Sequence, residues 1–496
     1  MTNTGERRLA DLGLAASGAA ETRITGLSVD SRLVKPGHLF AALPGTRIHG
    51  GEFIQYAIRM GAAAILTDRI GAEIAKAEIA EAGIPVVRTE DPRQALAHAA
   101  ALWFANTPKT IAAVTGTNGK TSVAAFARQI WQVLGHPAIN LGTTGVEGDW
   151  TAPLAHTTPE PITLHRTLAE AVREGITHVA MEASSHGLEQ KRLDGVQLLA
   201  AAFTNISQDH LDYHDTFDDY FEAKLGLFER VLPDDGTAVI NLDDPRGAEV
   251  VMTAEARGQD VLTVGASDRA ALHILAQRFE SEAQTLRFSW AGQTHQVRLG
   301  LIGGFQASNA MVAAGLVIAC GGEPRDVFNA LEHLTTVRGR MQHVATRENG
   351  ATVFVDYAHT PDAVATALAA LRPHVMGRII VVFGAGGDRD STKRPLMGAA
   401  ASRGADVAIV TDDNPRSEDP AAIRAAVIEG MSGDFSEVGD RAEAILRGVD
   451  ALGAGDALLI AGKGHETGQV IGDDVLPFDD AEQASVAVAA LDGRLA

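Results

Sequence analysis

Cysteine and aromatic residues are scarce in this chain. Cys320 is the one cysteine among 496 residues, which excludes an intramolecular disulfide and is typical of proteins in a reducing compartment. Aromatic residues make up 5% of the chain, whereas hydrophobic residues as a whole make up 46%. We therefore expect an interior packed mainly by alanine, valine and leucine, as in layered α/β domains.

Long apolar runs and excess positive charge are also missing. No apolar run approaches the roughly 18 residues of a membrane-spanning helix, and the charges near the N-terminus are not followed by an apolar signal core. Lysine and arginine number 42 against 63 aspartates and glutamates, a formal charge of −21. This balance argues against binding to nucleic acids or anionic membranes. We expect a soluble, cytoplasmic protein without a membrane span, which binds anionic ligands through helix N-termini and single arginines.

The length of the chain implies two to four domains, because one hydrophobic core rarely serves so many residues. Residues 106–108 (Asn-Thr-Pro) indicate a linker, since the residue before a proline is pushed towards extended geometry. A second boundary is expected near residues 337–339, beyond which a fresh series of strands begins. The sequence thus predicts three α/β domains, at 1–106, 107–337 and 338–496.

Short apolar segments alternate with helical patterns in the second and third domains, as in parallel sheets with crossover helices. The expected strands of the second domain are Ile111–Val114, His178–Met181, Leu198–Thr204 and Ala238–Asn241. Those of the third domain are Val353–Val355, Ile379–Phe383, Val407–Val410 and Ala457–Ile460. The strands of the third domain are apolar throughout, as strands buried on both faces should be.

The most informative segment is the turn at residues 116–121, with the sequence Gly-Thr-Asn-Gly-Lys-Thr. Glycines let backbone N–H groups close around a phosphate, and the following helical pattern adds the dipole of its N-terminus. Lys120 would reach the outer phosphates, and the Thr121 hydroxyl is placed for Mg²⁺. The strict P-loop pattern has another glycine at position 114, where this chain has valine. We interpret the turn as a shortened phosphate loop that binds a nucleoside triphosphate.

Two further strands of the second domain end in polar residues. Glu182 closes one of them, at the position where an acidic residue meets the Mg²⁺ of a phosphate loop in α/β folds. The serines that follow could equally make this a cap for the next helix. The run Asp209–His214 follows the next strand and suits either metal binding or loop capping.

Three strands of the third domain lead into loops rich in charged residues and glycine. The loops begin at Gly384, Thr411 and Ala461 and contain Arg389, Asp413, Arg416 and Glu466. If the strands are parallel neighbours, all three loops lie at the carboxyl ends, where open α/β sheets bind ligands. Arginine suits carboxylates and carboxylates suit ammonium groups, so this edge is a candidate amino-acid receptor. Caps and turns around the proline and glycines are the alternative interpretation.

Taken together, these motifs resemble those of one family, the Mur amide-bond ligases of peptidoglycan synthesis, over all three domains. The resemblance is carried by residues 116–121, Met181–Leu188, Asp209–His214, Gly304–Asn309, 339–342 (Gly-Arg-Met-Gln), Asp356–Pro361 and Asp413–Arg416. The last motif is the most specific, and it is similar to that of the members that add meso-diaminopimelate rather than L-lysine. Val29–Arg32 and Pro36–Phe40 are similar to the uridine-binding domain of the same members.

The resemblance implies a fold for each domain and a reaction. The first would be a uridine-binding α/β domain, the second a P-loop ATPase-like parallel sheet, and the third a Rossmann-like α/β domain. The implied enzyme adds meso-2,6-diaminopimelate to the D-glutamate γ-carboxylate of UDP-N-acetylmuramoyl-L-alanyl-D-glutamate. ATP would phosphorylate that carboxylate and the amine would attack the acyl phosphate, with Mg²⁺ and Lys120 offsetting the repulsion between anions.

The resemblance also implies where each ligand binds. ATP would contact Gly116, Thr117, Asn118, Gly119, Lys120, Thr121, Asn309, Arg340 and Asp356. The UDP-dipeptide would contact Val29, Ser31, Thr46, Arg47, Ile48, Thr157, Thr158, Ser184, Gln190 and Arg192. Diaminopimelate would contact Arg389, Asp413, Asn414, Pro415, Arg416, Gly462 and Glu466. One departure is His156, where relatives often have asparagine beside the threonine pair.

The residues implied to act directly in the reaction are Lys120, Lys224, Glu182 and His210. Mg²⁺ would be held by Thr121, Glu182, His210 and a carbamate on Lys224. By itself, the sequence around Lys224 predicts an ordinary solvated lysine on a helix, so its carbamate rests on the resemblance.

Other functions stay open on the residues alone. A P-loop kinase would account for residues 109–240 but for neither the N-terminal domain nor the loops beyond 380. A Mur-type ligase for L-lysine and a folylpolyglutamate synthetase-like ligase would share the ATP-binding centre. A nucleotide-sensing scaffold would need neither Lys120 nor Glu182. As partners we expect small-molecule substrates, and we expect the chain to be a monomer.

Overall fold

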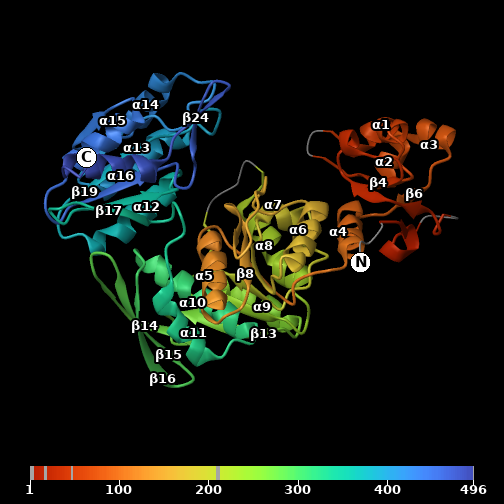
Figure 1. Cartoon of the computed structure of the whole chain (residues 1–496), viewed down its shortest axis with the longest axis horizontal. Helices are drawn as coiled ribbons and strands as arrows, with labels where there is room; N and C mark the ends of the chain where they lie inside the picture. The colour runs from red at the N-terminus through yellow and green to blue at the C-terminus, as the bar shows by residue number, and fades with distance from the viewer. Residues whose placement is uncertain (1–4, 16–18, 46–47, 208–212, 495–496) are drawn as a thin grey trace. The chain divides into compact units, whose positions relative to one another are not determined.

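The computed structural model describes residues 5–15, 19–45, 48–207 and 213–494. Its contacts divide the chain into a first unit, Met1–Thr263 with Gly315–Gly322, and a second unit, Val264–Ala314 with Glu323–Ala496. Figure 1 colours the elements in chain order, from red through yellow and green to blue. Three of the predicted site residues, Thr46, Arg47 and His210, lie outside the described residues.

The N-terminal region of the first unit forms a four-stranded parallel sheet in the order β3-β4-β5-β6. Its strands are β3 (Gly26–Ser28), β4 (His38–Ala42), β5 (Ala64–Thr67) and β6 (Val86–Arg88), and its helices are α1 (Ile54–Arg59), α2 (Arg69–Ile74), α3 (Lys76–Ala82) and α4 (Pro92–Phe104). Alternate residues of β4 serve opposite faces, as the two-residue period of a strand requires. Leu39 and Ala41 pack with α4, whereas Phe40 and Ala42 pack with α1.

The rest of the first unit is built on six strands in the order β12-β11-β7-β10-β8-β9, all parallel to their neighbours except β9. The strands are β7 (Thr110–Thr115), β8 (Ala138–Gly142), β9 (Gly145–Gly148), β10 (His178–Glu182), β11 (Ala200–Phe203) and β12 (Thr237–Asn241). The helices are α5 (Lys120–Val133), α6 (Pro161–Arg173), α7 (Ser185–Glu189), α8 (Phe217–Gly226) and α9 (Gly247–Ala256). Residues of α6 and α8 share one buried core with the strands.

The second unit begins with a β-meander, in which β14 (Leu272–Phe279), β15 (Gln284–Trp290) and β16 (Gln293–Leu299) pair antiparallel. The division between the units falls within β13 (Asp260–Gly265) and α10 (Gly304–Ala319). The short helix α11 (Pro324–Ala330) follows.

The C-terminal part of the second unit is a six-stranded sheet in the order β17-β18-β22-β19-β20-β21, parallel except for β17. Its strands are β17 (Gln342–Thr346), β18 (Thr352–Asp356), β19 (Ile379–Phe383), β20 (Val407–Val410), β21 (Phe435–Glu437) and β22 (Ala457–Ala461), and the hairpin β23 (Gly468–Ile471) and β24 (Asp474–Pro477) follows. The helices are α12 (Pro361–Leu371), α13 (Lys393–Gly404), α14 (Pro420–Ile428), α15 (Arg441–Asp450) and α16 (Asp480–Leu491). Helices α12, α13 and α14 pack on one face of the sheet, and α15 and α16 pack on the other. The region therefore has three layers, helix, sheet and helix.

The expectation of three α/β sheets is confirmed, and the predicted strand ends are close to the observed ones. The strands expected at Ile379–Phe383 and Val407–Val410 agree with β19 and β20. The strand expected at Leu198–Thr204 is shorter, since β11 spans only Ala200–Phe203. Among the described residues, no helix is both long and apolar enough to cross a bilayer.

Candidate active site

The predicted phosphate loop lies between β7 and α5, and its glycines have conformations that other residues rarely adopt. Gly116 has a φ of 147°, and a Cβ there would lie 1.9 Å from the hydroxyl of Thr204. Gly119, with a φ of 88°, is the N-cap of α5. The ammonium group of Lys120 donates to the carbonyls of Gly116 (2.9 Å) and Thr117 (2.8 Å). The ammonium group of Lys120 is therefore held at the turn, where it would contact a bound phosphate group.

Beside this loop, Thr121 and Glu182 come together from α5 and β10. The Thr121 hydroxyl donates to Glu182 Oε2 over 3.0 Å, and the carboxylate of Glu182, a residue that is 2% exposed, also accepts from the backbone N–H of Thr143. A Cβ on Gly142 would lie 1.9 Å from Glu182 Oε1, so only glycine leaves room there. Two adjacent oxygen atoms beside a phosphate loop could act as ligands of Mg²⁺, which prefers oxygen ligands.

Lys224 lies on α8 as expected but is not solvated. Its side chain is buried, with the residue 1% exposed, and its ammonium group donates to Gly116 O over 2.8 Å. The same nitrogen lies 4.3 Å from the centre of the Tyr220 ring. The prediction of a solvated lysine, made from the sequence alone, is therefore wrong. The ammonium group lies against the phosphate loop, although an ammonium group is costly to bury.

The predicted dipeptide-binding residues lie together next to Glu182. The hydroxyl of Thr158 donates to the Glu182 carbonyl (2.9 Å) and accepts from the Ser184 N–H (3.0 Å). Arg192 donates to Thr158 O and to Gln190 Oε1. The hydroxyl of Thr157 lies 3.1 Å from that of Thr143, which itself bonds Glu182. These contacts join the predicted dipeptide site to the predicted metal ligand.

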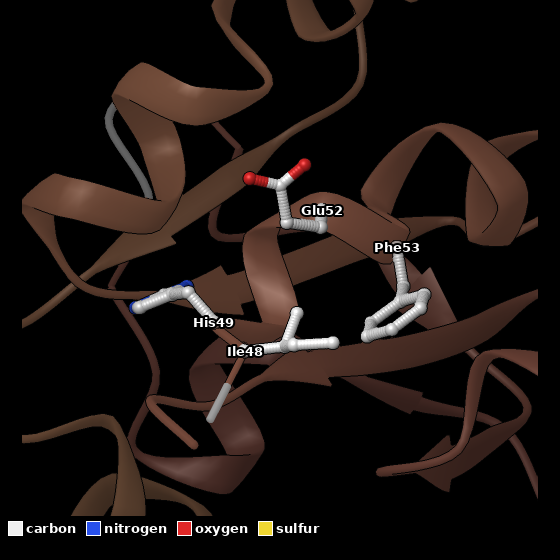
Figure 2. Close-up of a pocket in the computed structure, with 4 residues that line it drawn as sticks. All are labelled: Ile48, His49, Glu52 and Phe53. Atoms are coloured by element: carbon white, nitrogen blue, oxygen red, sulfur yellow. The ribbon is translucent and has the colours of Figure 1, made fainter. Parts of the chain in front are cut away.

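The N-terminal sheet carries an open pocket beside the predicted uridine-binding turn. The pocket has a volume of about 520 Å³ and is lined by Ile48, His49, Glu52 and Phe53, which Figure 2 shows around it. His49 Nδ1 accepts from the Gly51 N–H, and its Nε2 lies 3.3 Å from Asp68. The predicted residues Val29 and Ser31 lie in the loop after β3, and Ile48 lies in the loop after its parallel neighbour β4, which ends at Ala42. Both loops therefore leave the same edge of the sheet.

The remaining predicted ATP contacts belong to the second unit. The Asp356 carboxylate accepts from the N–H groups of Met341 (2.6 Å) and Ala358 (2.8 Å), while the Arg340 guanidinium lies 4.8 Å from the centre of the Tyr357 ring. Burial raises the pKa of Asp356, although the charge of Arg340 and both N–H donors oppose the rise. On α10, the buried Asn309 donates to Gln306 Oε1. 

In the C-terminal sheet, β22, β19 and β20 are parallel neighbours, so the three predicted amino-acid-binding loops do leave one edge. Asn414 links two of them. Its side-chain oxygen accepts from Lys463 (3.0 Å) and from the Val470 N–H (2.9 Å), and its amide donates to Glu466 Oε2 (2.8 Å). Lys463, buried and absent from the predicted set, also lies 3.2 Å from Glu466.

Asp413 presents a buried carboxylate oxygen to this site. Its Oδ1 accepts from the Asn414 N–H, whereas Oδ2 is buried without a hydrogen-bond partner among the described residues. A Cβ on Gly462 would lie 2.4 Å from that oxygen. Because a buried polar atom without a partner is costly, the arrangement suits a ligand that brings an N–H donor.

Arg416 stands at the end of the same loop with a left-handed backbone, at a φ of 52°. Its N–H donates to Val470 O, its carbonyl accepts from Gly472, and its guanidinium donates to Gly387 O over 2.8 Å. Arg389, from the next loop, is exposed near Gly386. The structure thus brings the predicted set Arg389, Asp413, Asn414, Pro415, Arg416, Gly462 and Glu466 to one edge of the sheet.

Sequence reasoning missed three features of this edge. Lys463, the ion pair of Arg441 with Asp480, and the hairpin of β23 and β24 all contact the predicted loops. Only Lys463 had a local signal, since it lies within the glycine-rich run after β22. The other two depend on pairings between residues distant in sequence.

Comparison with known proteins bears on all three regions. Residues 23–104 match the family model described as "Mur ligase family, catalytic domain", residues 114–317 match "Mur ligase middle domain", and residues 339–464 match "Mur ligase, glutamate ligase domain". A UDP-N-acetylmuramoyl-L-alanyl-D-glutamate–2,6-diaminopimelate ligase of Bradyrhizobium diazoefficiens is 50% identical to the chain over 95% of it and 96% of the relative. The chain belongs to the Mur ligase family.

Two further relatives of this Mur ligase carry the same name. The protein of Brucella melitensis is 48% identical and covers 96% of each chain. A solved structure of a UDP-N-acetylmuramoyl-L-alanyl-D-glutamate–2,6-diaminopimelate ligase superimposes with a TM-score of 0.72 at 32% identity, over 97% of this chain and 98% of that chain. The three-domain α/β fold of the Mur ligases therefore holds for this chain.

Proposed function

We propose that this Mur ligase joins meso-2,6-diaminopimelate to the D-glutamate γ-carboxylate of UDP-N-acetylmuramoyl-L-alanyl-D-glutamate at the expense of ATP, in peptidoglycan precursor synthesis. The observation that carries the proposal is the edge of the C-terminal sheet, where the buried acceptor Asp413 and the guanidinium of Arg416 share one loop. A ligand with both ammonium and carboxylate groups fits that pair. Relatives named for this reaction match the chain along almost its whole length.

In this proposal the phosphates of ATP are held by residues 116–121, with Asn309, Arg340 and Asp356 around the nucleoside and γ-phosphate. Thr121 and Glu182, whose oxygens lie 3.0 Å apart, would hold Mg²⁺ together with His210 and a carbamate on Lys224. The metal would supply positive charge where two anions must approach one another. Lys120 would add a second positive charge from the turn itself.

The dipeptide would be held by Thr157, Thr158, Ser184, Gln190 and Arg192, next to Glu182, and its uridine diphosphate by Val29, Ser31 and residues 46–48. A γ-carboxylate oxygen attacks the γ-phosphorus of ATP, and ADP leaves. The amine of diaminopimelate then attacks the acyl carbon, an amide bond forms, and phosphate leaves while the nitrogen loses a proton. The attack is faster when both reactants are held in place and water is excluded.

The proposal extends to organisation and location. We place the domain boundaries at 106/107 and 337/338, so that one domain binds UDP, one ATP and one the amino acid. The chain would act as a cytoplasmic monomer whose partners are its three small-molecule substrates. Its acidic charge of −21 supports a protein without nucleic-acid partners.

Phosphate release from the purified chain tests the function. We expect ADP and inorganic phosphate only when ATP, the UDP-dipeptide and meso-diaminopimelate are all present, with the UDP-tripeptide as product. A phosphorylated product that is stable without any amino acid would instead indicate a kinase. Equal rates with L-lysine would identify a ligase of different specificity, and turnover of a folate substrate would point to the folylpolyglutamate synthetase-like alternative.

A further inference from the structure

The C-terminal region contains a fully buried ion pair that the reaction has not used. Arg441, the first residue of α15, donates through Nε and Nη2 to the two oxygens of Asp480, the first residue of α16, each over 2.7 Å. Both side chains are 0% exposed. A bidentate pair of this kind fixes the plane of the guanidinium. 

The guanidinium also contacts two of the three amino-acid-binding loops, those after β20 and β22. Nη2 donates to the carbonyl of Ala461 over 3.0 Å, and Nη1 donates to the carbonyl of Asp412 over 3.4 Å. These carbonyls stand immediately before Gly462 and Asp413. One side chain thereby bonds the backbones of both loops, next to the residue whose Oδ2 is buried without a hydrogen-bond partner among the described residues.

The electrostatic surroundings keep the guanidinium charged. Burial lowers the pKa of Arg441, but the charge and hydrogen bonds of Asp480 and the charges of Asp413 and Glu466 outweigh it and raise the pKa. The positive charge therefore interacts with the same acidic groups that would receive the ammonium of the substrate.

We propose that Arg441 is a positioning residue for the incoming amino acid, acting through the Asp412 and Ala461 carbonyls rather than by touching the substrate. This inference rests on the proposed diaminopimelate site. Lysine keeps the charge but has three donors on a single nitrogen, so R441K cannot reproduce the four hydrogen bonds that the guanidinium makes from three nitrogens. We expect R441K to raise the KM for meso-diaminopimelate by about tenfold, while kcat and the KM values for ATP and the UDP-dipeptide change less than about twofold.

A matched control lies in the same unit. Arg347 pairs with Asp492 over 2.9 Å, with side chains 13% and 3% exposed, and donates to Val449 O, away from the three loops. R347K should lower the melting temperature but leave the KM for meso-diaminopimelate unchanged. If R441K fails to fold, the double variant R441M/D480L replaces the pair with apolar groups and removes both of its charges. It should show the same selective rise in KM.

The outcomes separate this inference from the proposed function. A wild-type protein that does not ligate meso-diaminopimelate overturns the function and this inference with it. An active wild type whose R441K variant, or the double variant where R441K does not fold, keeps the parental KM for meso-diaminopimelate overturns the inference alone. So does an equal rise in R347K, because that would mean a general loss of structure rather than a positioning effect.

Discussion

Lys120 is the residue on which the phosphate site most depends. Its ammonium group bonds two carbonyls of its own turn, so its removal takes away positive charge without opening a core. We expect Lys120→Ala to lower kcat/KM for ligation by on the order of 10³-fold or more, since it removes charge stabilisation from the transition state. Steady-state phosphate release measures this effect, and an unchanged melting temperature serves as the folding control. Near-normal turnover would show that this turn does not bind the phosphates of ATP.

Substitution of the buried Lys224 tests whether its side chain acts as an anion or as a cation. If the residue acts as a carbamate, its terminus is an anion beside Mg²⁺. Lys224→Ala should then lose activity, and short-chain carboxylates should restore part of it by filling the vacated space. Lys224→Arg keeps a positive charge and should stay inactive under the same conditions. An active arginine variant would show that the lysine serves as a simple cation or is dispensable.

Arg416 is expected to select diaminopimelate over lysine, because only diaminopimelate carries a second carboxylate for a guanidinium to bind. Lysine would leave the other guanidinium donors of Arg416 without that partner, and sites of this kind can discriminate by about 10⁴-fold. We expect Arg416→Ala to raise the KM for meso-diaminopimelate steeply and to leave the affinities for ATP and the UDP-dipeptide nearly unchanged. The preference for meso-diaminopimelate over L-lysine should become smaller. Comparable use of both amino acids by the wild type would contradict this role.

At the scale of elements, the hairpin of β23 and β24 holds the Asp413–Arg416 loop in place. Gln469 donates to Asp413 O over 2.7 Å, and Val470 bonds both Asn414 and Arg416. These bonds explain how Arg416 keeps its left-handed backbone, which costs a non-glycine residue about 1 kcal/mol or more.

Gln469→Ala tests this supporting role. It removes one donor from the loop, and we expect a rise of about threefold to tenfold in the KM for meso-diaminopimelate, which corresponds to one hydrogen bond. A control variant on the same hairpin is Val475→Ser, since Val475 is 67% exposed and should leave the KM unchanged. The hairpin has no supporting role if Gln469→Ala and Val475→Ser have the same KM.

At the scale of the whole molecule, acid sensitivity is expected where α4 packs on α6. His165 on α6 is 0% exposed, and neither ring nitrogen has a hydrogen-bond partner among the described residues. Burial, with a contribution from His98, lowers the pKa of His165 to about 4. Because the unfolded chain takes up this proton near pH 6.5 and the folded chain does not, stability falls as the pH drops from 6.5 towards 4, by roughly 3 kcal/mol in all.

Thermal unfolding between pH 7 and pH 4.5 checks this expectation. His165→Leu cannot titrate, so its melting temperature should fall less over that interval than the melting temperature of the wild type. His333→Gln, at an exposed histidine, should follow the wild type. Parallel curves for wild type and His165→Leu would mean that the pH dependence arises elsewhere.

Much of the fold and the chemistry could be predicted from local sequence. The phosphate loop, the strands β19 and β20, and the helix that carries Lys224 follow from glycine spacing, apolar runs and the residues nearby. Local patterns decide such elements because backbone conformation depends on a residue and its close neighbours. The three loops of the amino-acid site could be placed on one edge because parallel strands end together.

Only the tertiary structure decided which groups are buried and which partners they meet. The burial of Lys224 against Gly116 and the pairing of Arg441 with Asp480 join residues 39 or more positions apart. No local pattern encodes such pairings, because desolvation and hydrogen bonding depend on every element that packs around a group. The sequence therefore determined the elements and the kind of chemistry, and the packing of distant elements determined the charge environment in which that chemistry would take place.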